Sequence, residues 1–404
     1  MEQKKIFAIV AVVIVALAAF AVGFAIPKGD SSSDNKVTVR VAYGNLNGWD
    51  AVIYANETGM FENEGVHVES VMKADGGESM AAVMNNSADI TFVGVDPIIN
   101  SAVAESAVGL RVVGTMMMPL KSIMYMDYNK TKITPDNVVV TAGEDTTTKN
   151  IINGIVSADG TPTGQKIGIA LKTAWKSYFG GYVELLYKGG TVNGVTYAAD
   201  QITEKQYNAM MNFNDDRIYT AANVPDLATA ILSGNVAVIV GPYEKLGIAA
   251  QQDDKIECFN STGSIAAGFC LAVATKKIVE EHPEAIASVL RAIDKAGCIM
   301  RDDSTQHSFA KKTAWSIYNT KATESNIEEY AALQEKYYSS VILDVCNVAE
   351  TSKYISATAK ILGYSDFDVA DVYDAELEAK ILKMVHDGGK YHRSFDAGIS
   401  KFVD

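Results

Sequence analysis

Nine residues of this sequence could make hydrogen bonds, ion pairs or stacking contacts with a small solute. Asparagine and threonine donate and accept hydrogen bonds, while tryptophan and tyrosine provide flat apolar walls. A lysine and an aspartate add opposite charges, and a glycine at a helix start lets backbone amides approach a ligand. The candidate ligand contacts are Asn45, Asn47, Trp49, Gly77, Asp96, Thr173, Trp175, Lys176 and Tyr243.

Asp96 is the most informative of these candidates because it carries a negative charge. Its carboxylate would repel an oxyanion unless Lys176 or a group of backbone amides offset that charge. A neutral or partly cationic solute, such as an aminopyrimidine, would gain from it. The residue types therefore predict binding of a small molecule and leave the charge of that molecule open.

Most of these candidates follow predicted strands, and two similar units of the chain would position some of them. Residues 76–97 and 226–244 align without gaps at an offset of 147. Each unit has small and apolar residues at helical spacing, then a polar turn, then a short apolar strand that ends on glycine. Such strands are typical of a parallel sheet covered by helices on both faces.

Ligands of open α/β sheets bind beyond the carboxyl ends of the strands, so two such units predict two lobes that face one cleft. The fold class is therefore α/β, with two lobes joined by crossing strands. Lobe 1 is predicted to span 37–118 and 268–404, and lobe 2 to span 119–267. We expect hinges near Met118–Ser122 and Ala267–Leu271.

Further predicted elements support this organisation. Strands are expected at 37–43, 66–72, 110–115, 122–126, 165–170 and 269–274, and helices at 51–57, 98–106, 177–187, 278–293, 326–338 and 375–385. Pro283 stands near the start of one of these helices, a position that proline favours. Residues 129–164 are interpreted as an irregular surface insertion and 188–224 as a polar connection.

The N-terminus predicts attachment to or export across a membrane. Lys4 and Lys5 precede Ile6–Ile26, which contains no charged residue and is long enough to span a bilayer. The two lysines favour a cytoplasmic N-terminus, which places the rest of the chain outside the cell. An uncleaved anchor competes with a signal peptide cut near Ala21 or Ala25. Residues 1–36 are therefore an anchor or signal segment plus a polar linker.

Charge and motifs exclude several other functions. The net charge of −14 argues against nucleic-acid partners, which require a basic face. Nucleotide binding is excluded because the sequence has neither a GxGxxG motif nor a P-loop. The four cysteines lack CxxC spacing, so no metal site is predicted, and no cofactor is expected. Cys258 and Cys270 could pair, or all four cysteines could be buried thiols.

An enzyme is the opposing class, and the histidines argue against it. A general base is most often histidine placed beside a nucleophile. No histidine of this sequence lies in such a pattern, and there is no GxSxG motif. We therefore predict no catalytic residue. The five histidines are His67, His282, His307, His386 and His392.

Taken in order, the segments after Val37 resemble the extracytoplasmic solute-binding proteins of ABC importers, in the branch that carries nitrate, sulfonates, taurine and thiamine-precursor pyrimidines. The segment 58–65 resembles the family's Gly-x-Phe-x-x-x-Gly motif. Gly76-Gly77 is similar to the family's glycine-rich turn, and Ala88-Asp89-Ile90 to its Ala-Asp-Ile strand. Pro242-Tyr243 is similar to the Pro-Tyr end of a later strand of the family, and 280–284 to the start of a later helix.

The resemblance implies a small-molecule ligand, an ABC permease and ATPase as partners, and a location at the extracytoplasmic face of the membrane. The alternative is a ligand-sensing ectodomain, which would bind a solute but serve no permease. Relatives in cofactor biosynthesis make an enzyme the less favoured option. Val240 and Gly241 replace the aromatic and acidic residues found before Pro-Tyr in many relatives, so the ligand of the family is not carried over.

Overall fold

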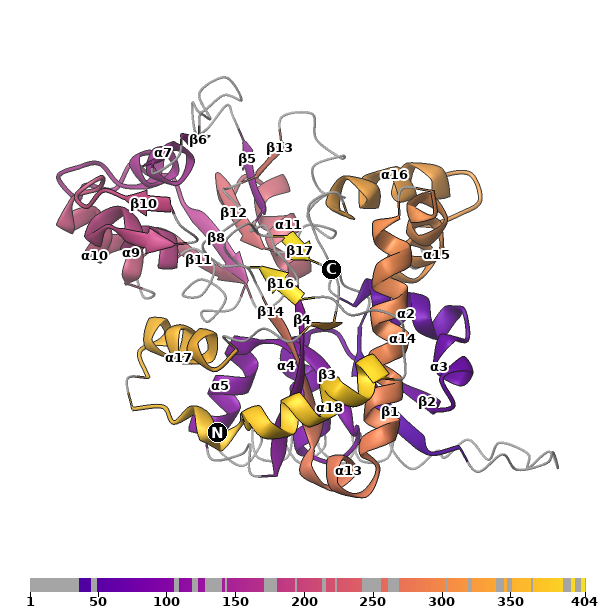
Figure 1. Cartoon of the computed structure of the whole chain (residues 1–404). Helices are drawn as coiled ribbons and strands as arrows, with labels where there is room; N and C mark the ends of the chain where they lie inside the picture. Colours follow the sequence, from indigo (N-terminus) through magenta and orange to yellow (C-terminus); the bar gives the residue numbers. More distant parts are fainter. Residues whose placement is uncertain are drawn as a thin grey trace, which may run out of the picture. The chain divides into compact units, whose positions relative to one another are not determined.

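The computed structural model describes most of the chain after residue 35 (Figure 1). The described residues are 36–44, 49–104, 109–117, 123–127, 140–141, 144–170, 180–192, 195–212, 216–221, 224–241, 256–260, 269–302, 304–318, 322–338, 345–346, 351–364, 366–387, 394–396 and 401–403.

Contacts divide the chain into two units, Met1–Lys36 and Val37–Asp404, and every element discussed below belongs to the second unit. The predicted anchor or signal segment Ile6–Ile26 lies outside the described residues. Among the helices that the structure describes, none is both long and apolar enough to cross a bilayer.

A mixed sheet of six strands forms the first half of the fold, in the order β15, β4, β14, β3, β1, β2 (Figure 1). Strand β1 pairs in parallel with β2 and β3, whereas β14 is antiparallel to both β3 and β4. The bounds are β1 (Thr38–Tyr43), β2 (His67–Met72), β3 (Ile90–Gly94), β4 (Leu110–Met117), β14 (Phe269–Thr275) and β15 (Val345–Cys346).

Both faces of this sheet are covered by helices, as its continuous apolar strands predict. Alternate residues of β14 show the division, because Ala272 and Ala274 pack in one core cluster and Leu271 and Val273 in another. Buried residues of α2 (Asp50–Glu57), α14 (Pro283–Arg301), α15 (Gln306–Tyr318) and α18 (Ala375–Asp387) belong to the first cluster. Those of α4 (Gly76–Met84), α5 (Val95–Val103) and α17 (Thr351–Leu362) belong to the second.

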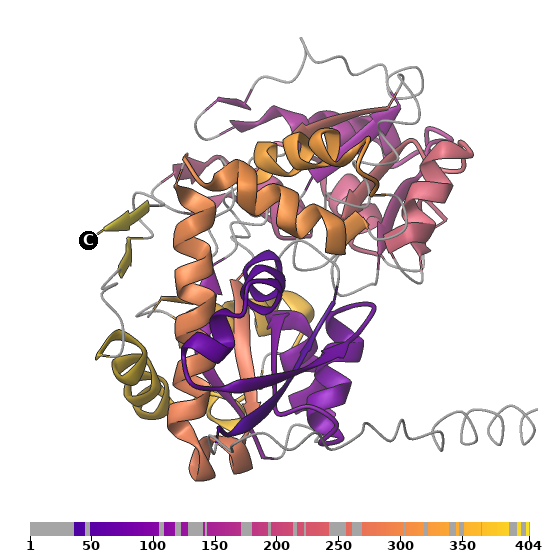
Figure 2. The same cartoon turned by 90° about the vertical axis from the view of Figure 1, so that its right-hand side faces the viewer.

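The long helix α14, orange in Figure 2, packs against α2, α18 and the short helix α3 (Met60–Asn63). Pro283 is its first residue, where the missing backbone N–H costs nothing, so that prediction is confirmed. Helix α13 (Lys276–Glu281) connects β14 to α14, and α16 (Ile327–Tyr338) packs against α15.

A second sheet of five strands has the order β11, β8, β12, β5, β13. Strand β8 is parallel to β11 and β12, and β5 is antiparallel to β12 and β13. Helices α7, α9 and α10 bury apolar residues against one face, and α11 packs on β8 and β12. The bounds are β5 (Ile123–Asp127), β8 (Ile167–Ala170), β11 (Ile218–Ala221), β12 (Val238–Gly241), β13 (Ile256–Asn260), α7 (Thr146–Ile155), α9 (Gly181–Lys188), α10 (Glu204–Met211) and α11 (Val224–Leu232).

Three short two-stranded ribbons and the 3-10 helix η4 (Val369–Asp371) complete the elements that the structure describes. They are formed by β6 (Val140–Thr141) with β7 (Glu144–Asp145), β9 (Gly190–Val192) with β10 (Val195–Tyr197), and β16 (Ser394–Asp396) with β17 (Lys401–Val403).

The two sheets exchange strands in sequence order. Strand β5 of the second sheet follows β4 of the first, and β14 of the first follows β13 of the second. The predicted lobe boundaries at 118/119 and 267/268 fall outside the described residues and stay a prediction. Of the predicted hinge Ala267–Leu271, the part from Phe269 onward lies within β14.

The two repeated units are present, but their register differs from the sequence alignment by one residue. Helices α4 and α11 end at Met84 and Leu232, which are 148 positions apart. The left-handed turn residues Asn86 and Gly234, with φ of 60° and 77°, have the same separation. The alignment at 147 matched the terminal glycines, whereas β12 is one residue shorter than β3.

Two segments interpreted as irregular contain regular structure. Helix α7 starts at Thr146, inside the predicted insertion. It is stabilised because Ile152, Ile155 and Val156 bury their side chains in the core cluster of the second lobe. Strand β11 and helix α10 lie inside the predicted connection 188–224. The capping box formed by Thr203 and Gln206 marks the start of α10.

Cys270 is a free thiol buried at the start of β14, so it does not pair with Cys258. Burial raises the pKa of the Cys270 thiol to about 12. Cys270 therefore acts as a small apolar residue in the core, as one of the two sequence alternatives proposed.

An ion cluster ties α14 to the residue that follows α3. Glu64 accepts a hydrogen bond from Arg291 Nε at 3.0 Å and contacts Lys295 Nζ, while Arg291 Nη1 donates to the Met384 carbonyl of α18 at 2.8 Å. Burial would raise the pKa of the Glu64 carboxyl, but its hydrogen bonds with Lys295 and Arg291 outweigh burial and lower that pKa. Glu64 is therefore held ionised in the folded protein.

Glu64→Gln is expected to lower the free energy of unfolding by about 1–3 kcal/mol at pH 7, because two cations lose their charged partner. Because the pKa of the Glu64 carboxyl is lower in the folded than in the unfolded state, its ionisation stabilises the fold when the pH is above the unfolded-state pKa. This stabilisation is lost as the pH falls through the folded-state pKa. The difference between wild type and variant in urea denaturation should therefore shrink from pH 7 towards pH 3.

Glu62→Gln is the matched control for this prediction. Glu62 pairs with His67 at 2.6 Å, but both side chains are about half exposed, so the loss should stay below about 1 kcal/mol. Equal losses for the two variants, or a Glu64→Gln difference that stays constant down to pH 3, would contradict the structural account of Glu64.

Candidate functional site

The carboxyl ends of three parallel strands meet at one edge of the first sheet. Strand β1 lies between β2 and β3, so the connections leaving β1 and β2 diverge there. Helices α2, α4 and α5 each begin just after one of these strands. This is the switch point at which open α/β sheets form ligand sites. We name the region beyond these three strand ends the strand-end site.

The backbone at this edge is packed too closely for a side chain at Gly44. A Cβ atom built on Gly44 would lie 2.2 Å from the Lys73 carbonyl oxygen and 3.0 Å from the Trp49 ring. In addition, the Lys73 amide donates a hydrogen bond to the Tyr43 carbonyl at 2.9 Å. Glycine after β1 therefore lets the ends of β1 and β2 stay in contact.

Trp49, a candidate ligand contact, is held by the protein itself. Its indole N–H donates to the Phe92 carbonyl at 2.6 Å, and only 5% of the residue is exposed. The side chain thus joins the start of α2 to strand β3. Its role as a ligand contact stays a prediction.

The start of α4 is capped by two of its own carboxylates. Asp75 Oδ1 accepts from the Glu78 amide at 2.9 Å, and Glu78 Oε2 accepts from the Ala74 amide at 3.1 Å. Gly77, another candidate contact, lies in this first turn, where a Cβ would be 3.2 Å from Asp75 Oδ1. The sequence spacing Asp75-x-x-Glu78 is a capping-box signal that the search for ligand contacts overlooked.

Asp96 lies in the first turn of α5 and is 8% exposed. Asp50, which the sequence did not single out, is the first residue of α2 and is 1% exposed. The starts of α4 and α5 approach each other, because a Cβ on Gly76 would lie 3.9 Å from Pro97 Cγ. All three helix starts at this edge therefore carry carboxylates.

The second sheet has an equivalent edge. Strands β8, β11 and β12 are parallel and end at Ala170, Ala221 and Gly241. The remaining sequence candidates follow β1, β8 or β12 directly and lie outside the described residues. They are Asn45, Asn47, Thr173, Trp175, Lys176 and Tyr243.

The Asp89 of the Ala-Asp-Ile segment has a structural role at the opposite edge. Its carboxylate accepts from the Arg40 backbone amide at 2.8 Å and from Arg40 Nε and Nη2 at 3.0 and 2.7 Å. The bidentate pair raises the pKa of the Arg40 guanidinium. This contact fixes the start of β3 against β1 and lies away from the strand-end site.

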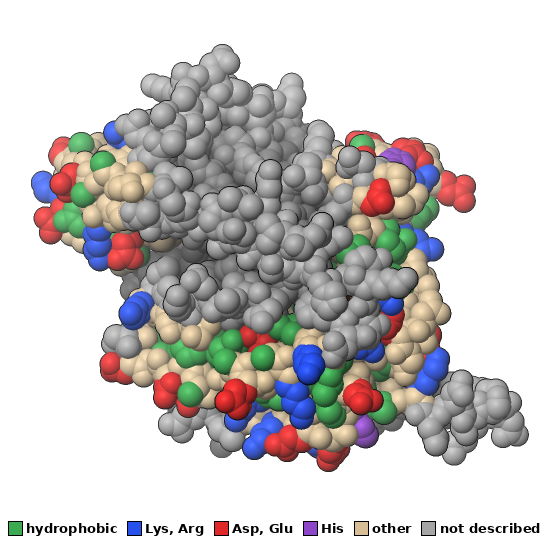
Figure 3. All heavy atoms as spheres, in the orientation of Figure 1, with side chains coloured by type: hydrophobic (Ala, Val, Ile, Leu, Met, Phe, Trp, Pro, Cys, Tyr) green, Lys and Arg blue, Asp and Glu red, His purple; other side chains and the backbone are tan. Residues whose placement is uncertain are grey.

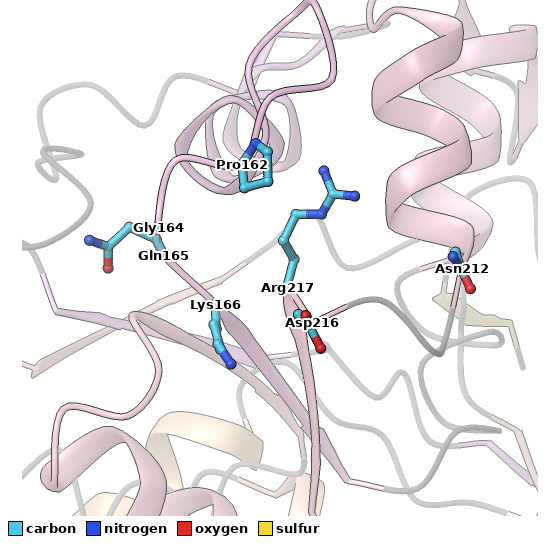
Figure 4. A pocket seen from close by; sticks show the side chains of 7 residues that line it. All are labelled: Pro162, Gly164, Gln165, Lys166, Asn212, Asp216 and Arg217. Carbon is cyan, nitrogen blue, oxygen red and sulfur yellow. The ribbon is translucent and has the colours of Figure 1, made fainter.

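A surface pocket of about 420 Å³ opens at the amino-terminal edge of the second sheet. It lies before β8 and β11, on the side away from the strand ends, and side chains of mixed charge surround it (Figure 4). Because ligands of open α/β sheets bind beyond the carboxyl ends of the strands, we do not assign this pocket, at the amino-terminal edge, to the ligand site. Its lining residues are Pro162, Gly164, Gln165, Lys166, Asn212, Asp216 and Arg217.

The described part of the chain contains no metal centre, and the face drawn in Figure 3 shows no basic patch among the described residues. No group of three or more His, Cys, Asp or Glu side chains there could hold a metal ion. On the face drawn in Figure 3, acidic and basic side chains are interspersed among the described residues. His67 and His307 pair with surface glutamates.

Residues 32–190 match the NMT1-like family, which is 159 of the 404 residues. No curated protein matches the sequence. The fold is similar to that of a putative sulfonate ABC transporter protein, the periplasmic sulfonate-binding protein SsuA from Methylobacillus flagellatus KT. The TM-score is 0.54 at 15% identity, over 89% of this chain and 98% of that one.

It is equally similar to the periplasmic nitrate-binding protein NrtA from Synechocystis PCC 6803, with a TM-score of 0.54 at 11% identity over 88% and 92% of the two chains. These likenesses confirm the expected fold class, the two-lobed α/β fold of periplasmic binding proteins. The desulfurization enzyme DSZB has a TM-score of 0.50 at 12% identity, over 86% of this chain and 99% of that one, so the fold also occurs in an enzyme.

Proposed function

We propose that this chain is the extracytoplasmic solute-binding component of an ABC import system. The observation that carries the proposal is the strand order shared by the two sheets, in a fold similar to sulfonate- and nitrate-binding transport proteins. Strands β2, β1, β3, β14 and β4 of the first sheet correspond in order to β11, β8, β12, β5 and β13 of the second. In each sheet, parallel strand ends lead into helices or into the candidate contacts. A small solute would bind between the two lobes and would be delivered to a membrane permease.

The proposed mechanism is closure of the lobes around the solute. Contacts with both lobes favour the closed state, since a ligand shifts an equilibrium towards the state it binds more tightly. The first lobe would supply Asn45, Asn47, Trp49, Gly77 and Asp96. The contacts proposed for the second lobe are Thr173, Trp175, Lys176 and Tyr243.

The N-terminal segment would keep the chain at the outer face of the cell membrane. Its length, its lack of charge and the preceding Lys4 and Lys5 support an anchor oriented with the N-terminus in the cytoplasm. The permease and ATPase of the importer would be the protein partners.

A solute-binding enzyme is the second candidate, and the likeness to a desulfurization enzyme is the observation that favours it. Two of the described histidines weigh against it, because His67, at the start of β2, and His307, on α15, engage glutamate side chains at the surface. We therefore favour the transport role.

A thermal unfolding screen of the purified full chain in mild detergent tests the proposal. Tryptophan fluorescence reports the unfolding. The solutes are nitrate, bicarbonate, taurine, alkanesulfonates, aminopyrimidines and flavins. A solute at 100 times its Kd stabilises the folded state by about 2.7 kcal/mol, which raises Tm by several degrees. Deleting the gene should abolish cellular uptake of that solute, whereas retained uptake would favour a sensor.

A further inference from the structure

We infer that His307 acts as a pH-sensitive clasp, which fastens helix α16 to helix α15 while its ring is protonated and loosens when the ring loses a proton. Helices α15 and α16 pack against each other (Figure 1). The inference goes beyond the proposed function, because it concerns the contact between these two helices and not the solute.

Both nitrogens of the His307 ring contact carboxylates of α16. Nδ1 lies 2.7 Å from Glu335 Oε1, and Nε2 lies 2.8 Å from Glu328 Oε2. The two glutamates are about two turns apart on α16, so one side of that helix presents both to the ring. An ionised carboxylate only accepts hydrogen bonds, and only the imidazolium carries a proton on each nitrogen. A neutral ring can therefore donate just one of these two hydrogen bonds.

Lys311 completes the charges of this contact. It lies one turn after His307 on α15, and its Nζ contacts Glu328 Oε1. With a protonated ring, His307 and Lys311 present two positive charges to the carboxylates of Glu328 and Glu335. When the ring is neutral, one negative charge is left in excess across the contact between the helices. The proton on His307 thus balances the charge of this contact.

The other helices packed on α15 bring their charges to other places. Glu57 of α2 accepts a hydrogen bond from Ser316 Oγ at 3.0 Å, more than two turns away from His307. Asp302, which follows α14, accepts from the Ser304 amide and hydroxyl at 2.8 and 2.6 Å. Within the described part of the chain, the hydrogen bonds of the His307 ring therefore go to α16 alone.

Hydrogen bonds to Glu335 and Glu328 raise the pKa of the His307 imidazole above its ordinary value of 6.5. Hydrogen bonds from Lys311 and His307 lower the pKa of the Glu328 carboxyl. Since the folded state binds the His307 proton more tightly than the unfolded state, the clasp contributes fully below about pH 6.5. Its contribution is lost as the pH rises through the folded-state pKa. Half of the His307 side chain is exposed, so the effect is modest and is screened by salt.

Helix α15 is held in place independently of the clasp. Phe309 is fully buried and stacks on Tyr54 of α2, with ring centroids 4.5 Å apart. Between α15 and α16, Thr313 Oγ1 donates to Gln334 Oε1 at 2.6 Å, and both residues are fully buried. Loss of the proton therefore loosens α16 around a contact that persists, and it leaves α15 packed on α2.

The first test measures the pKa of His307 by NMR, on the purified full chain in mild detergent with isotope-labelled histidine. His307→Gln identifies the resonance. Glu335→Gln removes one carboxylate charge and keeps an oxygen acceptor, so the His307 midpoint should fall by about 0.5–1 pH unit. Glu329→Gln is the control, because it removes the same charge from an exposed neighbour of Glu328 on α16. Its shift should be about 0.2 pH unit or less.

The second test follows hydrogen exchange of the backbone amides, expressed as protection factors so that the intrinsic pH dependence of exchange cancels. The protection of α16 relative to α15 should fall about two- to fivefold between about pH 6 and about pH 8.5. In His307→Gln this ratio should stay constant with pH, because the titrating group is gone.

An unchanged His307 midpoint in Glu335→Gln, or equal shifts in Glu335→Gln and Glu329→Gln, would overturn the inference. So would a protection ratio that is constant with pH in the wild type, or one that changes equally in His307→Gln. These outcomes leave solute binding untouched, since the thermal unfolding screen tests it separately.

Discussion

Trp49→Ala is expected to lower the free energy of unfolding by about 3–5 kcal/mol, the range for truncating a buried aromatic residue. The side chain is 5% exposed and belongs to the core cluster formed with α2 and α14. Trp49→Phe keeps much of the apolar volume but removes the indole donor to the Phe92 carbonyl, so it should cost about 1–3 kcal/mol. Urea denaturation measures both losses.

Trp315→Ala is the matched control for this prediction. Trp315 lies on α15 and is 44% exposed, so its truncation should cost less than about 1 kcal/mol. A Trp49→Ala variant as stable as Trp315→Ala would contradict the structural role of Trp49. Solute titration of Trp49→Phe then separates the two roles, because a loss of binding with little loss of stability would identify Trp49 as a ligand contact.

Gly44→Ala should also be strongly destabilising, by about 2–4 kcal/mol, because the added Cβ would lie 2.2 Å from the Lys73 carbonyl oxygen. Neither atom belongs to a flexible side chain, so the ends of β1 and β2 must move apart. We expect a lower Tm and, because the site is built on these strand ends, weaker solute binding.

Gly154→Ala is the control for this substitution. Gly154 lies inside helix α7, and no neighbouring atom would come within 4 Å of a Cβ there. Alanine at that position should stabilise the protein by about 0.5–1 kcal/mol, since glycine is unfavourable in helices. A Gly44→Ala variant with wild-type Tm would show that the two strand ends can separate without cost.

Apolar periodicity predicted the elements that bury a continuous stripe. Strands β1, β3, β4, β8 and β14 and helices α16 and α18 lie within a few residues of their expected positions. The helix expected at 278–293 is divided at His282 into α13 and α14, and α14 continues to Arg301. The segments that failed are those in which burial depends on distant partners. Helix α7 starts with three threonines, and it is Ile152 and Ile155, packed in the core of the second lobe, that stabilise it.

The register of the repeat shows a second limit of sequence reasoning. Matching Gly94 to Gly241 aligned similar residues, but the backbone sets the equivalence through hydrogen bonds to the neighbouring strand. The Asp89 amide donates to the Arg40 carbonyl and the Ala237 amide to the Lys166 carbonyl, which gives an offset of 148. Residue types alone do not specify such a shift of one position.

The candidate site was predictable as a place in the fold more than as a set of side chains. Strands that end in glycine and lead into helices indicated the edge at which β1, β2 and β3 end. The pattern did not indicate that Trp49 is held by Phe92 or that Asp50 is buried, because both depend on packing between elements. Six of the nine candidate contacts lie outside the described residues and stay predictions.

The position of β14 has a consequence for how this protein is made. This strand lies between β3 and β4, yet it begins 152 residues after β4 ends. At 5–20 residues per second, a ribosome needs roughly 8–30 s to add those residues. Throughout that interval the nascent chain carries the inner edges of β3 and β4 without the strand that joins them. Chaperones that bind exposed strand edges therefore have a defined period in which to act on it.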